Sequence, residues 1–141
     1  MILYFDSSAL VKRYVEEQGT SDVLGWMDTS DLNGTVLVTR SEVVAAITRA
    51  KRMRYVSQED TRKFLDTFHR EWSSFQRLPV SETLVARADA LACEHNLRGY
   101  DAIHLASALT WQELLDLPVT VVTYDMELAA AAQASGLLVL P

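Results

Sequence analysis

The sequence contains little of what disulfide-stabilised, membrane-spanning or exported proteins depend on. Cys93 is the single cysteine among 141 residues, so no disulfide framework can form and a reducing cytoplasm is expected. No apolar run reaches the roughly 18 residues that span a bilayer. No basic stretch precedes the first apolar residues, and Asp6 interrupts them early. We therefore expect neither a signal peptide nor a membrane segment.

Glycine is missing from "FDSSAL", the stretch that follows the first apolar segment. Dinucleotide-binding folds and P-loops need a glycine-rich turn there, so both are excluded. A haloacid-dehalogenase-like phosphatase would need a second aspartate two residues after Asp6, where this chain has Ser8. A receiver domain would need paired acids after the first strand and a lysine after the last, and no lysine follows Lys63.

Basic residues are missing from the last third of the chain, because no lysine or arginine follows Arg98. Residues 1–39 carry a net charge of −4, residues 40–98 carry +3, and residues 99–141 carry −5. The total of −6 argues weakly against a nucleic-acid binder. A basic middle between acidic ends fits a protein that holds a polyanion on one side and cations on another. Solvated helix faces explain the pattern equally well.

Strand-like and helix-like patterns alternate along the whole chain. Strands are predicted at residues 2–5, 35–39, 77–80, 118–123 and 137–140. Helices are predicted at residues 8–17, 22–29, 41–54, 57–75, 81–96, 99–115 and 125–134, with a turn at Asn33-Gly34. There is no internal repeat and no long linker. The pattern predicts a single α/β domain over residues 1–141, with about five mostly parallel strands flanked by about seven helices.

Acidic side chains follow three of the predicted strands. Asp6 follows the first strand, Glu42 the second and Asp125 the fourth, and Asp101 opens the helix in "RGYDAIHLASAL". Ligands of open parallel sheets bind beyond the carboxyl ends of the strands, so we expect these acids to converge. Asp101 and Asp125 could instead cap their helices, and Glu42 could be a first-turn acid. Asp6 is harder to explain this way, because Ser7 or Ser8 can cap the helix that follows it.

Converging carboxylates repel one another, so such a cluster is either protonated or neutralised by a cation. Basic neighbours in the sequence are sparse, with Arg40 near Glu42 and Arg98 near Asp101. A divalent metal ion is the simplest neutraliser, and all-oxygen ligation suits Mg²⁺ or Mn²⁺ rather than zinc. Two such ions can activate a water and stabilise the leaving oxygen of a phosphodiester.

The chain resembles the PIN-domain ribonucleases, and specifically the VapC-type toxins of bacterial toxin–antitoxin pairs. Four stretches carry the resemblance, in the family's order: "YFDSSALVKRY", "SEVVAAI", "LRGYDAIHLASAL" and "VVTYDMELAAAAQASGL". They cover essentially the whole chain. The resemblance implies a three-layer PIN-like domain and an Mg²⁺- or Mn²⁺-dependent endoribonuclease with RNA as its substrate. It also implies a homodimer and a cognate antitoxin that binds as a helix in an apolar groove.

The resemblance maps the family's acidic set, catalytic and metal-binding at once, onto this chain. The set is Asp6, Glu42, Asp101 and Asp125. Asp6 and Asp101 would be the firmest metal ligands, Asp125 would bind directly or through water, and Glu42 would bind metal or deprotonate the attacking water. Ser7 and Thr123 would supply hydroxyls beside the acids. The alternative is a catalytically idle PIN-like module that binds RNA or protein; its mark would be a broken acidic set, and this set is whole.

Two further features are left open by the sequence. His104, three residues after Asp101, is either a metal ligand or, as its apolar neighbours favour, a hydrogen-bonded packing histidine. The second feature is a basic run at the end of the predicted helix that begins near Glu42. It consists of Arg49, Lys51, Arg52 and Arg54. This run either follows an RNA backbone or places cations at a helix C-terminus. Neither the RNA, whether transfer, ribosomal or messenger, nor the number of metal ions can be read from the sequence.

Overall fold

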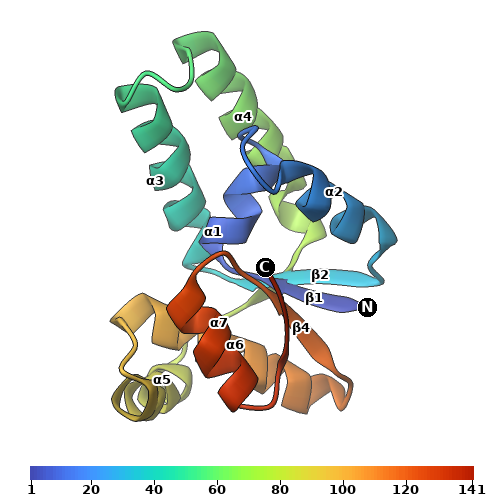
Figure 1. The fold of residues 1–141 in the computed structure, drawn as a ribbon, viewed down its shortest axis with the longest axis vertical. Coiled ribbons are helices and arrows are strands. Elements are labelled where there is room, and N and C mark those ends of the chain that lie inside the picture. The colour runs from blue at the N-terminus through green and yellow to red at the C-terminus, as the bar shows by residue number, and fades with distance from the viewer.

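The computed structural model describes residues 1–141 and shows helices alternating with strands (Figure 1). The strands are β1 (Ile2–Phe5), β2 (Leu32–Val36), β3 (Gln76–Leu78), β4 (Val119–Val122) and β5 (Leu138–Leu140). The helices are α1 (Ser7–Leu10), α2 (Thr20–Thr29), α3 (Thr39–Arg52), α4 (Gln58–Glu71), α5 (Glu82–His95), α6 (Gly99–Leu115) and α7 (Met126–Ala134). Two short 3-10 helices, η1 (Val11–Arg13) and η2 (Trp72–Ser74), extend α1 and α4. The predicted α/β class is confirmed.

The five strands form one parallel sheet in the order β3-β2-β1-β4-β5. β1 is central, pairing with β2 on one side and with β4 on the other. The chain builds the half β1-β2-β3 first and then crosses back to place β4 beside β1. This reversal of strand order is a switch point, and the crevice beyond the carboxyl ends of β1 and β4 is where such sheets bind ligands.

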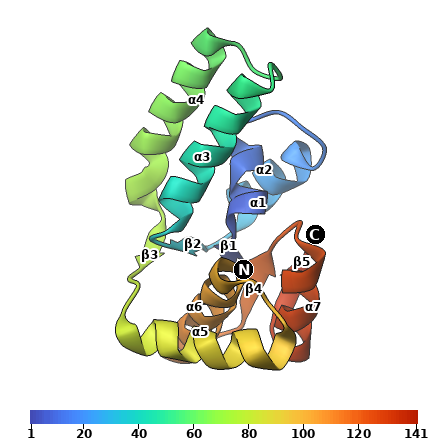
Figure 2. The same ribbon diagram turned by 90° about the vertical axis from the view of Figure 1, so that its left-hand side faces the viewer.

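Helices cover both faces of the sheet, with α1–α4 on one side and α5–α7 on the other (Figures 1 and 2). The side chains of β1 alternate between the two faces, as the two-residue period of a strand requires. Leu3 and Phe5 pack with α1–α4, whereas Ile2 and Tyr4 pack with α5–α7. Because both faces are buried, β1 reads as an uninterrupted apolar run. The three-layer arrangement is confirmed.

β2 corrects the prediction for its region. It begins at Leu32 rather than at residue 35, and the predicted Asn33-Gly34 turn is wrong because both residues lie inside the strand. Gly34 pairs with Tyr4 of β1, and a Cβ atom built on Gly34 would clash with the Trp111 ring. The glycine is therefore explained by the close approach of an α6 tryptophan to the bare backbone. Because β2 lies nearer the N-terminus than predicted, α3 starts at Thr39 rather than at residue 41.

The helix predicted at residues 8–17 is shorter in the structure. α1 ends at Leu10 and η1 ends at Arg13. Just past η1, the Tyr14 hydroxyl donates to Glu71 of α4 (2.8 Å). Likewise, β3 ends at Leu78 instead of residue 80, at the edge of the sheet, as expected of a strand next to a proline. No helix in the chain has the length and apolar character needed to cross a membrane.

Candidate active site

Asp6 lies directly after β1, at the switch point, and is only 3% exposed. Its Oδ1 accepts the Ala9 backbone N–H at 3.0 Å, so Asp6 is the N-cap of α1. The prediction that Ser7 or Ser8 caps this helix is wrong: Ser8 Oγ donates to the Asp6 carboxylate instead (2.8 Å). Thr123, directly after β4, donates its hydroxyl to Asp6 Oδ2 at 2.7 Å. These bonds fix the carboxylate between the ends of β1 and β4.

Two of the four acids are buried carboxylates with raised pKa values. Burial raises the pKa of Asp6, and the nearby His104 ring and the Thr123 hydroxyl only partly oppose that rise. Burial also raises the pKa of Asp101, which is 3% exposed; its hydrogen bond from Arg98 lowers the pKa and the Asp125 charge raises it. Desolvation penalises an ionised carboxylate, so both positions would gain from an added cation.

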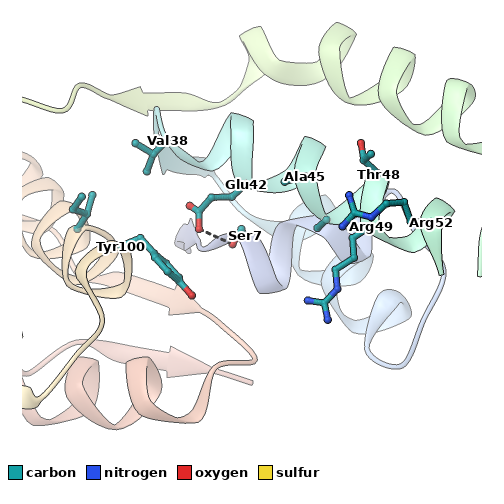
Figure 3. A pocket seen from close by; sticks show the side chains of 10 residues that line it. Ser7, Val38, Glu42, Ala45, Thr48, Arg49, Arg52 and Tyr100 are labelled. Carbon is teal, nitrogen blue, oxygen red and sulfur yellow. Dashed lines mark hydrogen bonds between the residues drawn. The ribbon is translucent and has the colours of Figure 1, made fainter.

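Glu42 lies in the first turn of α3 and is held from two sides. Its Oε2 accepts the Ser7 hydroxyl at 3.2 Å, as Figure 3 shows, and its Oε1 lies 2.8 Å from His104 Nε2. The other ring nitrogen, Nδ1, lies 2.8 Å from the Tyr4 hydroxyl. Burial raises the pKa of Tyr4 well above its ordinary value. When Nε2 carries the ring proton and donates it in a hydrogen bond to Glu42, Nδ1 can accept a hydrogen bond from the Tyr4 hydroxyl.

His104 is thus a buried ring, 1% exposed, with both nitrogens within hydrogen-bond distance of a partner, which agrees with the interpretation as a packing histidine. The sequence does not reveal that the His104 ring lies between Tyr4 and Glu42. Its partners Tyr4 and Glu42 come from β1 and α3, and no local pattern connects them to α6. The only available signal was the placement of Tyr4 on a central strand two residues before Asp6.

Arg98 joins the two remaining acids. Its Nε donates to Asp101 Oδ2 at 3.0 Å, and its Nη2 donates to Asp125 Oδ2 at 2.9 Å. Asp125 also caps α7, because its Oδ1 accepts the Leu128 N–H at 2.9 Å. The sequence indicates Arg98 as a neighbour of Asp101 alone, since Asp125 belongs to a distant segment. The guanidinium therefore supplies a positive charge to both acids.

The acids at the carboxyl edge of the sheet are connected through hydroxyl groups. Thr123 Oγ1 donates to Asp6 and accepts the Asp125 backbone N–H at 3.0 Å. Ser7, the residue after Asp6, reaches Glu42. The site therefore consists of two hydrogen-bonded groups that meet at the adjacent residues Asp6 and Ser7. One joins Asp6 to Asp125 and Asp101 through Thr123 and Arg98, and the other joins Ser7 to Glu42 and His104.

The donor set agrees with Mg²⁺ or Mn²⁺ in its chemistry, because it offers carboxylate oxygens, two of them on buried side chains with raised pKa values. In the arrangement shown, however, no three histidine, cysteine, aspartate or glutamate side chains converge closely enough to hold a metal ion. Arg98 occupies an oxygen of both Asp101 and Asp125. A metal ion that used those oxygens would have to displace the guanidinium.

Replacing Arg98 with glutamine should tighten Mn²⁺ binding by about 3- to 10-fold. The guanidinium competes for carboxylate oxygens, and the gain is modest because the Arg98 side chain is 58% exposed. Isothermal titration with Mn²⁺ measures the affinity. Arg87→Gln is the matched control, since it removes an arginine paired with Glu113 outside the site (2.7 Å). Weaker Mn²⁺ binding by the Arg98 variant would show that this arginine supports the ion rather than competing with it.

Comparison with known proteins gives consistent results. The family model for the PIN domain matches residues 3–134. Ribonuclease VapC45 of Mycobacterium tuberculosis (strain CDC 1551 / Oshkosh) is 31% identical over 140 residues, which cover 99% of this chain and 95% of that protein. A toxin–antitoxin complex from Klebsiella pneumoniae aligns with a TM-score of 0.61 at 23% identity, over 100% of this chain and 97% of the other. FitAcB from Neisseria gonorrhoeae aligns with a TM-score of 0.69 at 15% identity, over 99% and 97%.

Proposed function

The chain belongs to the PIN-domain family, and on that basis we propose that it is an Mg²⁺- or Mn²⁺-dependent endoribonuclease and the toxin of a toxin–antitoxin pair. The observation that carries this proposal is the complete acidic set at the carboxyl edge of the sheet: Asp6, Glu42, Asp101 and Asp125. The similarity to ribonuclease VapC45 over nearly the whole chain supports RNA as the substrate.

We assign the acids two functions in this reaction. Asp6, Asp101 and Asp125 would hold the divalent ion, and Glu42 would hold it or act as the base. When bound, the ion supplies an activated water and neutralises the charge that develops on the leaving oxygen. The choice follows from burial and position, because Asp6 and Asp101 are the buried acids, whereas Glu42 is linked to a histidine.

Glu42 is the residue best placed to receive a proton. Its Oε1 lies 2.8 Å from His104 Nε2, and the Tyr4 hydroxyl would favour the tautomer that donates to Glu42 by donating to Nδ1. Its Oε2 carries only the longer bond from Ser7, so this oxygen can accept the proton of the attacking water. The water oxygen bonds to phosphorus as the bond from phosphorus to the 3′ oxygen breaks, and solvent protonates that oxygen. The products carry 5′-phosphate and 3′-hydroxyl ends.

We further propose a cognate antitoxin as the protein partner, supported by the shared fold with the toxin–antitoxin complex from Klebsiella pneumoniae. The homodimer and the assignment of residues 1–141 to one nuclease domain also remain part of the proposal. We also propose a cytoplasmic location, which agrees with an RNA substrate and with the free, exposed thiol of Cys93.

Incubation of the purified protein with total RNA should produce cleavage in the presence of Mg²⁺ or Mn²⁺ and none in EDTA. Sequencing of the cut ends should find new 5′-phosphates, because water attack releases the 3′ oxygen. Asp101→Asn, prepared in the same way, controls for contaminating ribonucleases, which would cut in both samples. An absence of metal-dependent ends in the wild-type digest would overturn the proposal.

The alternative function, an idle PIN-like module that binds RNA or protein, predicts a different result. Titration of the nuclease with Mn²⁺ should release heat that Asp101→Asn diminishes, since that variant lacks a ligand charge. An idle module should show neither carboxylate-dependent heat nor cleavage. The two measurements together distinguish the two functions.

A further inference from the structure

A groove lies beside Glu42, between α3 and the start of α6 (Figure 3). Its volume is about 700 Å³, within the range of pockets that bind small ligands. The α3 side contributes Val38, Glu42, Ala45, Ala46, Thr48, Arg49 and Arg52; Ser7, Tyr100 and Ile103 complete the lining. The groove therefore opens from the candidate active site and continues along α3.

The α3 wall of the groove is a single helical stripe. Glu42, Ala45, Arg49 and Arg52 follow one another at three- and four-residue spacing, which places them on one face of the helix. Ala45, in the middle of this stripe, has a small side chain that leaves space in the groove. The two arginines lie at the end of the stripe away from Glu42. Figure 3 shows Arg49 and Arg52 projecting on the same side as Glu42. The wall thus runs from the proposed base to two cations.

The two arginines have no acidic partner. Arg49 and Arg52 form no ion pair or side-chain hydrogen bond, in contrast to Arg98, which binds both Asp101 and Asp125. Both are exposed. Glu42 is the only acid in the lining, although the whole chain carries a net charge of −6. Positive charge has therefore been left free at this groove, where a polyanion would neutralise it.

Tyr100 forms the opposite wall and is 46% exposed. The Arg98 guanidinium lies 5.1 Å from the centroid of the Tyr100 ring, so a cation covers one ring face and helps to hold the ring in place. In Figure 3 the ring extends toward the gap between α6 and α3. An exposed aromatic ring held in this way is the kind of platform on which a nucleobase stacks.

We propose that this groove binds a single-stranded segment of the RNA substrate next to the scissile phosphate, with phosphates on Arg49 and Arg52 and a base stacked on Tyr100. Only an unpaired base can present its face to the ring, which selects single-stranded over duplex RNA. The apolar surface of Val38, Ala45 and Ile103 lies where the sugar and base would pass. This inference rests on the proposed function and specifies its substrate as an unpaired region.

RNA binding measured in EDTA, where the RNA is not expected to be cut, tests the part of the groove that contains Arg49 and Arg52. The probe is a fluorescein-labelled, randomised single-stranded RNA of about 12 nucleotides. Arg49→Gln with Arg52→Gln should weaken its affinity by about tenfold or more and lower the salt slope of log K by about 1.4, the value for two phosphate contacts. The control Arg40→Gln with Lys51→Gln removes the same charge from exposed positions on α3 outside the groove, and should change affinity by less than about threefold.

Stacking is tested separately at Tyr100. Tyr100→Ala should weaken binding of the single strand by about 5- to 100-fold, whereas Tyr100→Phe should retain it. An RNA carrying 2-aminopurine should lose fluorescence on binding the wild type and Tyr100→Phe, and lose less on binding Tyr100→Ala. Ala45→Trp fills the groove from an exposed position without a change in charge, so it should also weaken binding.

The outcomes separate this inference from the proposed function. A wild-type protein that cuts RNA while all groove variants bind the single strand normally would overturn the RNA groove and leave the nuclease intact. A duplex RNA bound as tightly as the single strand would overturn the stacking platform. A wild type that never cuts RNA yet loses binding in the groove variants would overturn the nuclease function alone.

Discussion

Asp6→Asn should lower the rate of RNA cleavage by about a thousandfold or more while the protein stays folded. Asp6 combines burial, a raised pKa and a position between the ends of β1 and β4, so its charge is the one most dependent on a bound cation. Asparagine keeps the size of the side chain and the oxygen that caps α1 but removes the charge. The loss should therefore appear in the chemical step, measured as single-turnover cleavage of a labelled RNA.

The same variant should be more stable than the wild type when divalent ions are absent. Burial raises the pKa of Asp6 in the folded protein, so between the ordinary pKa and the raised one the folded state binds more protons than the unfolded state. Stability from this group is greatest at low pH and falls as the pH rises through that window. Asparagine does not ionise, so the variant does not lose this stability as the pH rises. We expect a melting temperature about 3 °C higher in EDTA at pH 7, equivalent to about 1 kcal/mol.

Thermal melts in EDTA, followed by circular dichroism, measure the change in melting temperature. The circular dichroism spectrum at room temperature shows whether the fold is kept. Glu127→Gln is the control, because Glu127 is an exposed acid in the first turn of α7, next to Asp125 but outside the two hydrogen-bonded groups. It should change neither property. Cleavage within tenfold of wild type would remove Asp6 from the reaction, and an earlier melt in EDTA would show that its charge carries no penalty.

Gly34→Ala should destabilise the protein by about 3 kcal/mol, lowering the melting temperature by about 10 °C. The added Cβ would clash with the Trp111 ring, which is only 6% exposed and is packed in the core between the sheet and α6. The ring has little room to retreat, so β2 or α6 must shift. Urea unfolding, with the free energy extrapolated to water, measures the loss.

The double variant Gly34→Ala with Trp111→Leu identifies the cause. Leucine leaves space for the new methyl group, so the combined loss should be smaller than the sum of the two single losses by about 1 kcal/mol or more. Gly25→Ala in α2 is the matched control: no atom lies within 4 Å of its Cβ position, and alanine favours a helix, so stability should rise slightly. Additive losses in the double variant would mean that Trp111 is not the obstacle.

Much of the fold follows from local patterns in the sequence. The apolar runs of β1 and β4 mark strands buried on both faces. At the starts of α4 and α5, the Ser57 and Ser81 hydroxyls accept first-turn N–H groups, as serine does at helix N-termini. The Asn33-Gly34 pair predicts a turn that the structure does not contain. Gly34 is instead explained by the close approach of Trp111, a residue of a distant helix. Local chemistry can identify a residue that permits a turn, but it cannot tell when a distant ring requires a bare backbone.

The candidate site divides in the same way. The resemblance identifies the four acids, and the structure gathers them at one edge, although their functions stay predictions. The bridge from Arg98 to Asp125 and the bond from His104 to Glu42 join segments that meet only after folding, so spacing along the chain does not reveal them. Asp6 was underestimated as a cap because serines follow it, and the serine hydroxyl of Ser8 turns toward the carboxylate instead.

Tyr4 joins the interior of the protein to its chemistry. Its ring is fully enclosed among core residues beneath α6, while its hydroxyl lies within hydrogen-bond distance of His104 Nδ1. A substitution that repacks the centre of the sheet at this position would therefore also remove a hydrogen-bond partner of the ring that contacts Glu42.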